Sequence, residues 1–148
     1  MNENRFSCSG YIIHENKVLL IHHKKLNLWL PVGGHIEKDE TPDEAMIREA
    51  KEEIGIDIEI HNRSELPFGA NVVKNMAVPF HVNVHKAGDH EHCCFFYLCT
   101  CKNNDLEINK NEVNGFQWFN SDELKDEKVP LDVKHIAWKA FEIFNNGR

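Results

Sequence analysis

The order of apolar and polar residues divides the first part of the chain into short extended segments. Residues 5–14 and 17–23 are rich in β-branched and aromatic residues, and Glu15-Asn16 between them favours a turn, so the two segments predict a β-hairpin. After a polar connection, residues 28–30 predict a short strand that leads the chain into a loop at Gly33-Gly34.

More extended segments follow farther along the chain. Residues 56–60 alternate between isoleucine and acidic residues, and this period of two predicts a half-buried strand. The other predicted strands are an alternating one at 78–86, with apolar side chains on one face and histidines on the other, a central one at 92–101 that is buried on both faces, and a last short one at 115–119.

Two main helices are predicted between and after these strands. The first has Thr41 as its N-cap, Pro42 at its first position and Glu44 to complete a capping box, and Gly55 ends it. The second occupies residues 132–144. The apolar faces are expected to contain Met46, Ile47, Ala50 and Ile54 in the first helix and Val133, Ile136, Ala137, Ala140, Phe141 and Phe144 in the second.

Strands flanked by two helices at irregular intervals predict an α/β or α+β layered fold. The length of 148 residues suits one domain, and we expect a single domain at 1–148. Residues 61–75 carry turn formers and little periodicity, which predicts a loop with at most a short strand.

Three glutamates crowd about one turn of the first predicted helix. Glu49, Glu52 and Glu53 lie at i, i+3 and i+4, on the side opposite the apolar face, with the small Ala45 in the middle of this side. Like charges at this spacing repel each other, and a divalent cation would reverse the sign of the interaction. Carboxylate oxygens suit Mg²⁺, Mn²⁺ or Ca²⁺. The alternative interpretation is a solvated acidic helix face.

Neighbouring residues favour the metal interpretation. Gly33 and Gly34 precede the helix and have the backbone freedom to turn a carbonyl toward the same ion, so both are candidate ligands beside the three glutamates. Glu40 and Arg48 add a further acid and a cation that can hold one glutamate in place.

These residues form one longer pattern. It consists of glycine, five residues, glutamate, seven residues, Arg-Glu, a small apolar residue, one residue, Glu-Glu, one residue, glycine and isoleucine. The pattern resembles the signature of the Nudix hydrolases, with every polar position filled at the family's spacing. Ala50 is smaller than the family's usual aliphatic residue, which affects packing and not chemistry. The residues in order are Gly34, Glu40, Arg48, Glu49, Ala50, Glu52, Glu53, Gly55 and Ile56.

The resemblance implies a fold, a reaction and a set of roles. The Nudix fold is an α/β/α sandwich around a mixed β-sheet. Nudix enzymes cleave a nucleoside diphosphate linked to another group by attack of water at phosphorus, with Mg²⁺ or Mn²⁺ as cofactor. By this resemblance Glu49, Glu52 and Glu53 bind metal, Arg48 orients Glu49, and Glu40 anchors Arg48.

The resemblance also directs attention to residues outside the signature. Many members supply one more carboxylate from a loop before a tryptophan-containing strand, a place that Glu112 fills ahead of Trp118, so the general base is Glu49, Glu53 or Glu112. Some members carry a His-x-His stretch whose histidines line the substrate cleft, which His90 and His92 resemble.

His81, His85, His90 and His92 also suggest zinc, but the cysteines contain no CxxC pair, and exposed histidines at a strand edge are the alternative.

Composition excludes several classes of protein. A net charge of −7 argues against binding a nucleic acid polymer, since a polyanion needs a basic surface. No apolar run is long enough to span a bilayer, and the first ten residues lack the features of a signal peptide, so a cytoplasmic protein without membrane contact is expected. Five cysteines, an odd number without a CxxC pair, fit reduced thiols.

The substrate remains open at this stage. The family's spacings for ADP-ribose and dinucleoside polyphosphate enzymes call for a proline or a tyrosine where Val72, Val73 and Lys74 stand, so neither is met. A small nucleoside diphosphate derivative is expected as substrate. The alternatives are a catalytically silent nucleotide-binding or regulatory protein, although such proteins typically lose signature glutamates, and a Ca²⁺-binding structural module. The family often dimerises, so a homodimer is compatible with the resemblance.

Overall fold

The structure is a computed structural model and describes residues 5–147. Within these residues the chain forms a mixed β-sheet, two α-helices and one short 3₁₀ helix. The bounds are β1 Phe6–His14, β2 Lys17–His23, β3 Trp29–Leu30, β4 Val32–His35, α1 Pro42–Ile54, β5 Ile58–Ile60, β6 His81–Ala87, β7 His90–Cys101, β8 Val113–Phe119, η2 Glu123–Lys125 and α2 Leu131–Asn146.

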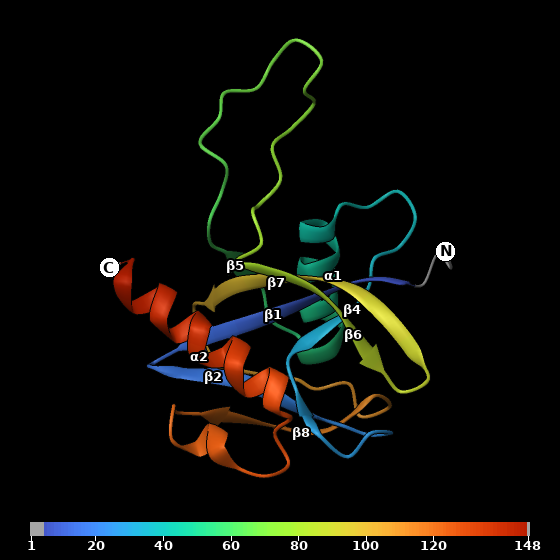
Figure 1. Cartoon of the computed structure of the whole chain (residues 1–148), viewed down its shortest axis with the longest axis vertical. Coiled ribbons are helices and arrows are strands. Elements are labelled where there is room, and N and C mark those ends of the chain that lie inside the picture. Colours follow the sequence, from blue (N-terminus) through green and yellow to red (C-terminus); the bar gives the residue numbers. More distant parts are fainter. Residues whose placement is uncertain (1–4, 148) are drawn as a thin grey trace.

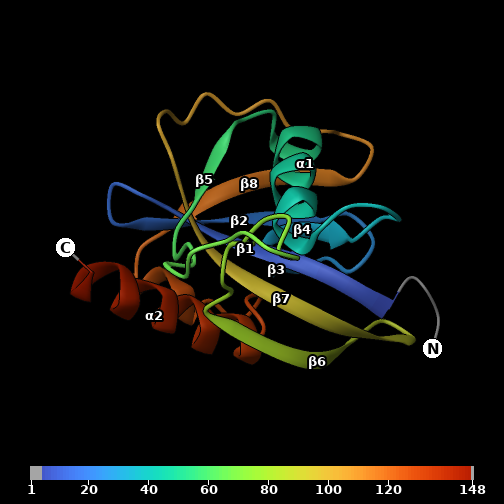
Figure 2. The same ribbon diagram turned by 90° about the horizontal axis from the view of Figure 1, so that it is seen from above.

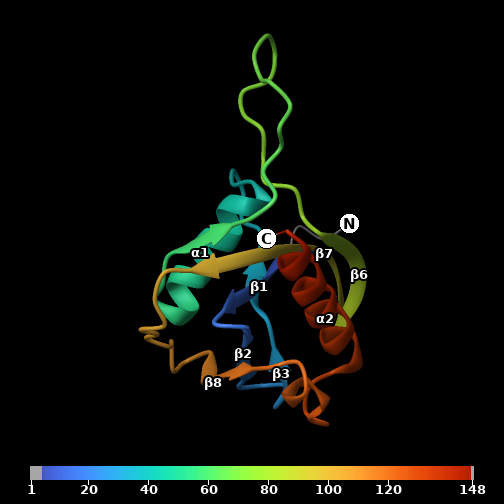
Figure 3. The same ribbon diagram turned by 90° about the vertical axis from the view of Figure 1, so that its left-hand side faces the viewer.

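The elements form three layers. Helix α1 lies against one face of the sheet and α2 against the other (Figures 2 and 3). Strands β1 and β7 are parallel, whereas the other strand pairs are antiparallel. The α/β/α sandwich around a mixed sheet that the resemblance implied is therefore confirmed.

Strand β1 is central to the sheet and pairs with three other strands. One edge of β1 pairs with β7 from Phe6 to Ile13. The other edge pairs with β4 along Ser7–Gly10 and with β2 only at Ile13 and His14. Because two strands share this edge, β2 and β4 pair with different parts of β1, and residues of both line the cleft described below.

Alternating residues of β1 supply two separate cores. Cys8 and Ile12 pack with Met46 on the side of α1. Tyr11 and Ile13 pack with apolar residues of α2 on the other side. Because successive side chains of β1 point to opposite faces, the two helices pack against the same strand from opposite sides.

The buried face of α1 differs from the predicted one. Ala45 and Glu53 are buried with Met46 and Ile54, whereas Ile47 is 42% exposed. The face that packs on the sheet is therefore rotated toward the glutamates. Ala45 does not leave space above the helix, because it lies in the core and allows α1 to pack closely on the sheet.

The glycine pair, which the sequence predicts in a loop, lies in a strand instead. Gly33 and Gly34 belong to β4 and pair with Ser9 and Cys8 of β1. Among residues 5–147, the glycines with positive φ are Gly55, Gly69 and Gly88, so the glycine pair serves close packing and not an unusual backbone conformation.

Residues 61–77 form a long loop that projects from the body of the molecule (Figure 1). A single bridge between Arg63 and Ala77 closes its base. Asp43 at the start of α1 accepts a hydrogen bond from the Ala77 N–H at 3.0 Å, which ties the loop to the helix. None of the helices within residues 5–147 combines the length and apolar character that a bilayer crossing requires.

Candidate active site

The glutamates of α1 face a cleft of about 990 Å³. The cleft runs from the acidic side of α1, past β4 and the N-terminal half of β1, to the start of α2. We call Glu49, Glu52, Glu53 and Glu112 the acid patch, and all four line the cleft.

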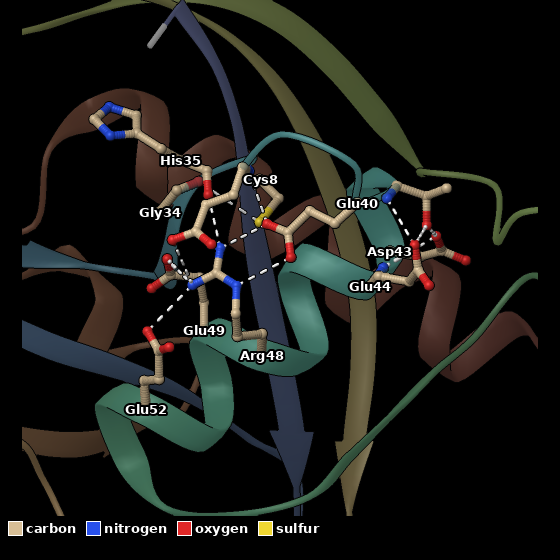
Figure 4. A network of polar contacts seen from close by, with 11 residues as sticks. Cys8, Gly34, His35, Glu40, Asp43, Glu44, Arg48, Glu49 and Glu52 are labelled. Carbon is tan, nitrogen blue, oxygen red and sulfur yellow. Dashed lines mark hydrogen bonds and ion pairs between the residues drawn. The ribbon is translucent and has the colours of Figure 1, made fainter. Parts of the chain in front are cut away.

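Arg48 is the centre of a hydrogen-bonded network beside the acid patch (Figure 4). Its Nε and one terminal nitrogen bind both oxygens of Glu40, at 3.0 and 2.7 Å. The other terminal nitrogen donates to Glu49 at 2.9 Å and to Glu52 at 3.1 Å. A further bond, to the His35 carbonyl at 3.0 Å, joins the network to β4. The fork of the guanidinium therefore fixes three carboxylates relative to the sheet.

Glu53 is the buried member of the acid patch, with only 5% of its surface exposed. Burial raises the pKa of its carboxyl to about 8, and the charges of Glu49 and Glu112 act in the same direction. The Gly33 N–H donates to it at 2.9 Å and partly offsets this effect. The hydrogen bond from Gly33 thus does not compensate a negative charge on Glu53, and the protonated form is favoured unless a cation binds beside it.

Glu49 packs against Gly34 of β4. A Cβ on Gly34 would lie 2.5 Å from the Glu49 carboxyl, so only glycine leaves room for this side chain. Burial raises the pKa of Glu49, while Arg48 opposes the shift.

Glu112 reaches the cleft through a loop that caps α1. The N–H groups of Glu107 and Asn109 bind the last carbonyls of α1, at Ile54 and Glu53, each at 2.9 Å. This brings Glu112 close enough to raise the pKa of both Glu49 and Glu53 by its charge. The carboxylate of Glu112 itself has no hydrogen bond or ion pair among residues 5–147.

The profile of the NUDIX domain family matches residues 4–139 of the sequence. The chain belongs to the NUDIX family. A NUDIX hydrolase from Clostridium perfringens is 30% identical, and the alignment covers 97% of this chain and 99% of that one with a TM-score of 0.83. No curated protein matches the sequence.

Two other solved structures share the fold at lower identity. An Ap4A hydrolase from C. elegans is 18% identical over 97% of this chain and 98% of its own, with a TM-score of 0.73. A MutT NUDIX hydrolase from Burkholderia pseudomallei is 21% identical over 93% of this chain and 95% of its own, with a TM-score of 0.64. The chain is therefore a pyrophosphohydrolase of the NUDIX family.

The NUDIX signature residues have the oxygen donors that a divalent cation requires. Within residues 5–147, no three side chains of the ligand types stand in positions that would hold an ion. The reason lies in their present contacts, since Arg48 engages Glu49 and Glu52 and the Gly33 N–H engages Glu53. The oxygen donors and the uncompensated charge fit Mg²⁺ or Mn²⁺, whose binding would replace some of these contacts.

The structure separates the two histidines of the His-x-His stretch. His92 lines the cleft, and its Nε2 lies 3.2 Å from Nε2 of His35. His90 lies next to the β6–β7 turn, 70% exposed, and pairs with Asp89, so it is not brought to the cleft. His35 and Tyr11 also line the cleft, although the sequence analysis did not predict them as site residues. The alternation of side chains along β1 and β4 was the signal that could have placed them on a face of the sheet.

Arg48→Lys is expected to lower kcat by about 10- to 100-fold, the usual effect of losing an outer-shell partner of a metal ligand. Lysine keeps the charge but cannot bind Glu40 through two nitrogens while also reaching Glu49 and Glu52. Steady-state kinetics with Arg63→Lys, at the base of the exposed loop, as control would measure the effect. Equal kinetics of the two variants would contradict a positioning role for Arg48.

Proposed function

We propose that the protein hydrolyses the pyrophosphate bond of a nucleoside diphosphate derivative, with water attacking at phosphorus. The observation that carries this proposal is the convergence of four carboxylates in one cleft, one of them buried with its pKa raised to about 8. Four carboxyl groups beside the single cation of Arg48 suit a metal ion, which would favour the ionised form of Glu53 and in turn attract a pyrophosphate.

The ligands we propose for Mg²⁺ or Mn²⁺ are Glu49, Glu52, Glu53 and the carbonyl of Gly33 or Gly34. Bound there, the cation would neutralise substrate charge and lower the pKa of a bound water. Arg48 would orient Glu49 and Glu52, and Glu40 would hold Arg48 in place.

Glu112 is the general base that the contacts favour. Glu49 accepts from Arg48 and Glu53 accepts from the Gly33 N–H, so both have lone pairs engaged. Glu112 lines the cleft with its carboxylate unengaged among the described residues, so it can accept a proton from water.

Glu112→Gln is therefore expected to lower kcat by about 10²-fold, the lower range for loss of a general base. Glu107→Gln, an exposed glutamate of the same loop, is the matched control. If Glu112→Gln retains the parent rate, the base is Glu49 or Glu53.

The reaction itself is tested by a panel of nucleoside triphosphates, nucleotide sugars and dinucleoside polyphosphates, each with Mg²⁺, with Mn²⁺ and with EDTA. Products are separated chromatographically, and a reaction in H₂¹⁸O shows by mass spectrometry whether the label enters a phosphate product. Metal-dependent turnover with labelled phosphate is expected. Binding of panel members without any turnover would instead support the alternative of a silent nucleotide-binding or regulatory protein.

A further inference from the structure

Three imidazole rings gather on one face of the sheet, near the start of β1. Ser7 of β1 pairs with His35 of β4 on one edge and with Cys94 of β7 on the other, so these side chains point to the same face. His92 lies two residues before Cys94 and faces the same side, and His85 of β6 is its cross-strand partner. His35, His85 and His92 all line the cleft, and we call them the histidine cluster.

Two of these rings present nitrogen atoms to each other. Nε2 of His35 lies 3.2 Å from Nε2 of His92, whereas the ring centroids are 5.0 Å apart. Each of these nitrogens is therefore on the side of its ring that faces the other ring. Two nitrogens bound to one tetrahedral Zn²⁺, at the usual Zn–N distance, lie about 3.3 Å apart. The pair thus already has the spacing of two zinc ligands.

His85 has the kind of partner that metal-binding histidines usually have. Its Nδ1 lies 3.0 Å from Oδ1 of Asn83, so the amide oxygen accepts the Nδ1 proton and the lone pair remains on Nε2. Metal-binding histidines commonly donate their second ring nitrogen to such an acceptor, which fixes the tautomer and the ring orientation.

The histidine cluster does not yet enclose an ion. The ring centroids of His85 and His92 are 5.8 Å apart, and within residues 5–147 no three ligand side chains stand close enough to share a metal. His85 would therefore turn toward the other two rings on binding.

The surroundings of His92 favour the form of imidazole that binds metal. Burial lowers the pKa of His92, and charge on His35, His85 or His90 acts in the same direction. A neutral ring has the free lone pair that coordination requires. His35 stands at an exposed position of β4, so an ion can reach the pair from solvent.

The histidine cluster differs from the acid patch in place and in chemistry. Figure 4 shows the ring of His35 pointing away from the Arg48 network, although the His35 carbonyl accepts from Arg48. Carboxylates suit Mg²⁺ and Mn²⁺, whereas imidazoles suit Zn²⁺ and its transition-metal neighbours. The same cleft therefore offers two sets of donors that select different ions.

We propose that His35, His85 and His92 bind one Zn²⁺ ion, separate from the ion of the acid patch. Water or a substrate oxygen would occupy the fourth position, the usual arrangement where a protein supplies three zinc ligands. The other two histidines nearby are not included, because His81 does not line the cleft and His90 is 70% exposed at the β6–β7 turn. This inference goes beyond the proposed function, since zinc binding requires no turnover.

Isothermal titration with ZnCl₂ is the direct test. The full-length protein, without a polyhistidine tag and freed of metal, is titrated in excess Mg²⁺, and one Zn²⁺ per chain is expected. His35→Gln and His92→Gln should each weaken binding about 100-fold or more, because losing a ligand costs at least as much as losing its outer-shell partner. His81→Gln, on the exposed part of β6 outside the cleft, is the matched control and should bind zinc like the parent.

The third ligand is tested by His85→Gln and Asn83→Ala. Each is expected to weaken zinc binding about tenfold, and the double variant should bind no more weakly than His85→Gln alone, because Asn83 acts through the His85 ring. Zinc affinity of His85→Gln equal to that of the parent would remove His85 from the site.

Co²⁺ in place of Zn²⁺ identifies the donor atoms without relying on the variants. Tetrahedral nitrogen ligation gives visible d–d absorption, whereas a cysteine ligand would add a sulfur-to-metal charge-transfer band in the near ultraviolet. We expect the first band without the second, and its loss in His92→Gln. The Tm of each variant in EDTA shows whether it is folded.

Two results would overturn the inference. If the parent binds no zinc, His35 and His92 share only a hydrogen bond, with one Nε2 protonated. If zinc binds equally well to His35→Gln and His92→Gln but is lost in Glu52→Gln, the ion belongs to the acid patch.

The inference and the proposed function can fail separately. Zinc binding at the histidine cluster without turnover of any panel substrate would leave this site standing and contradict the reaction. Metal-dependent turnover by a protein that binds no zinc would do the reverse.

Discussion

Replacement of Glu53 by glutamine is expected to lower kcat by about 10³-fold, the upper range for removing one electrostatic contact to a reacting centre. Glu53 is the buried carboxylate of the acid patch, and its Oε1 is fixed by the Gly33 N–H. Glutamine keeps that hydrogen bond through its own carbonyl but removes the negative charge, so the loss would report on charge and not on shape.

The measurement pairs kinetics with metal binding. Glu59→Gln, on the exposed side of β5, is the matched control. In the parent and in this control, Mg²⁺ is expected to raise Tm, because a ligand that binds only the folded state stabilises it. Glu53→Gln should show little or no rise. A variant that keeps both the metal-dependent Tm shift and the parent kcat would remove Glu53 from the proposed site.

Glu53→Gln is also expected to change the pH dependence of stability in the absence of metal. The pKa of Glu53 is about 8 in the folded protein, against an ordinary value of 4.5, so the folded state binds this proton more tightly than the unfolded chain. The stability of the parent in EDTA should therefore fall as pH rises from about 4.5 to about 8 and then level off. At about 1.4 kcal/mol per pKa unit, the difference amounts to a few kcal/mol.

Urea unfolding in EDTA at several pH values would check this expectation. Glu53→Gln should be about as stable as the parent at the acid end of the range and more stable at pH 8. Parallel curves for the two proteins would show that the buried carboxylate keeps an ordinary pKa.

The two glycines of β4 are expected to respond differently to the same added methyl group. In Gly33→Ala the new Cβ would lie 2.1 Å from the backbone oxygen of Cys8, which β1 holds in place, so we expect a loss of about 3 kcal/mol in the free energy of unfolding. In Gly34→Ala the Cβ would meet the movable end of Glu49 instead. The protein should fold, with Glu49 displaced and kcat lowered by about 10²-fold, as for a misplaced catalytic group.

Denaturant unfolding and kinetics on both variants would measure these effects, and each variant serves as the control of the other. A Gly34→Ala protein with the parent rate would show that the position of Glu49 is not needed for turnover. A Gly33→Ala protein of unchanged stability would show that β1 and β4 can separate without cost.

Much of the fold could be predicted because its signals are local. The caps of α1 depend on Thr41, Pro42 and Gly55, which act on their immediate neighbours, and the observed helix has the predicted bounds. Residues 61–75 lack periodicity, and they lie in the projecting loop. The NUDIX family itself could be recognised, because the signature is contiguous in sequence.

The face of α1 that is buried could not be predicted from periodicity. Ile47 is more apolar than Glu53, yet Ile47 is exposed and Glu53 is buried. The sheet packs where Ala45 and Ala50 allow close approach, and this choice depends on the opposing strand and not on the helix alone. The raised pKa of Glu53 follows from that packing.

The sequence by itself determined the chemistry of the three helical glutamates of the acid patch, since their residue types and spacing repeat within adjacent turns of α1. Only the tertiary structure decided which other groups line the same cleft. Tyr11, His85 and Asp132 are far apart in sequence, and all three line this cleft because the sheet aligns β1 with β7 and β6 while α2 packs across them. Contacts of this kind depend on strand register and helix placement, which no local pattern encodes.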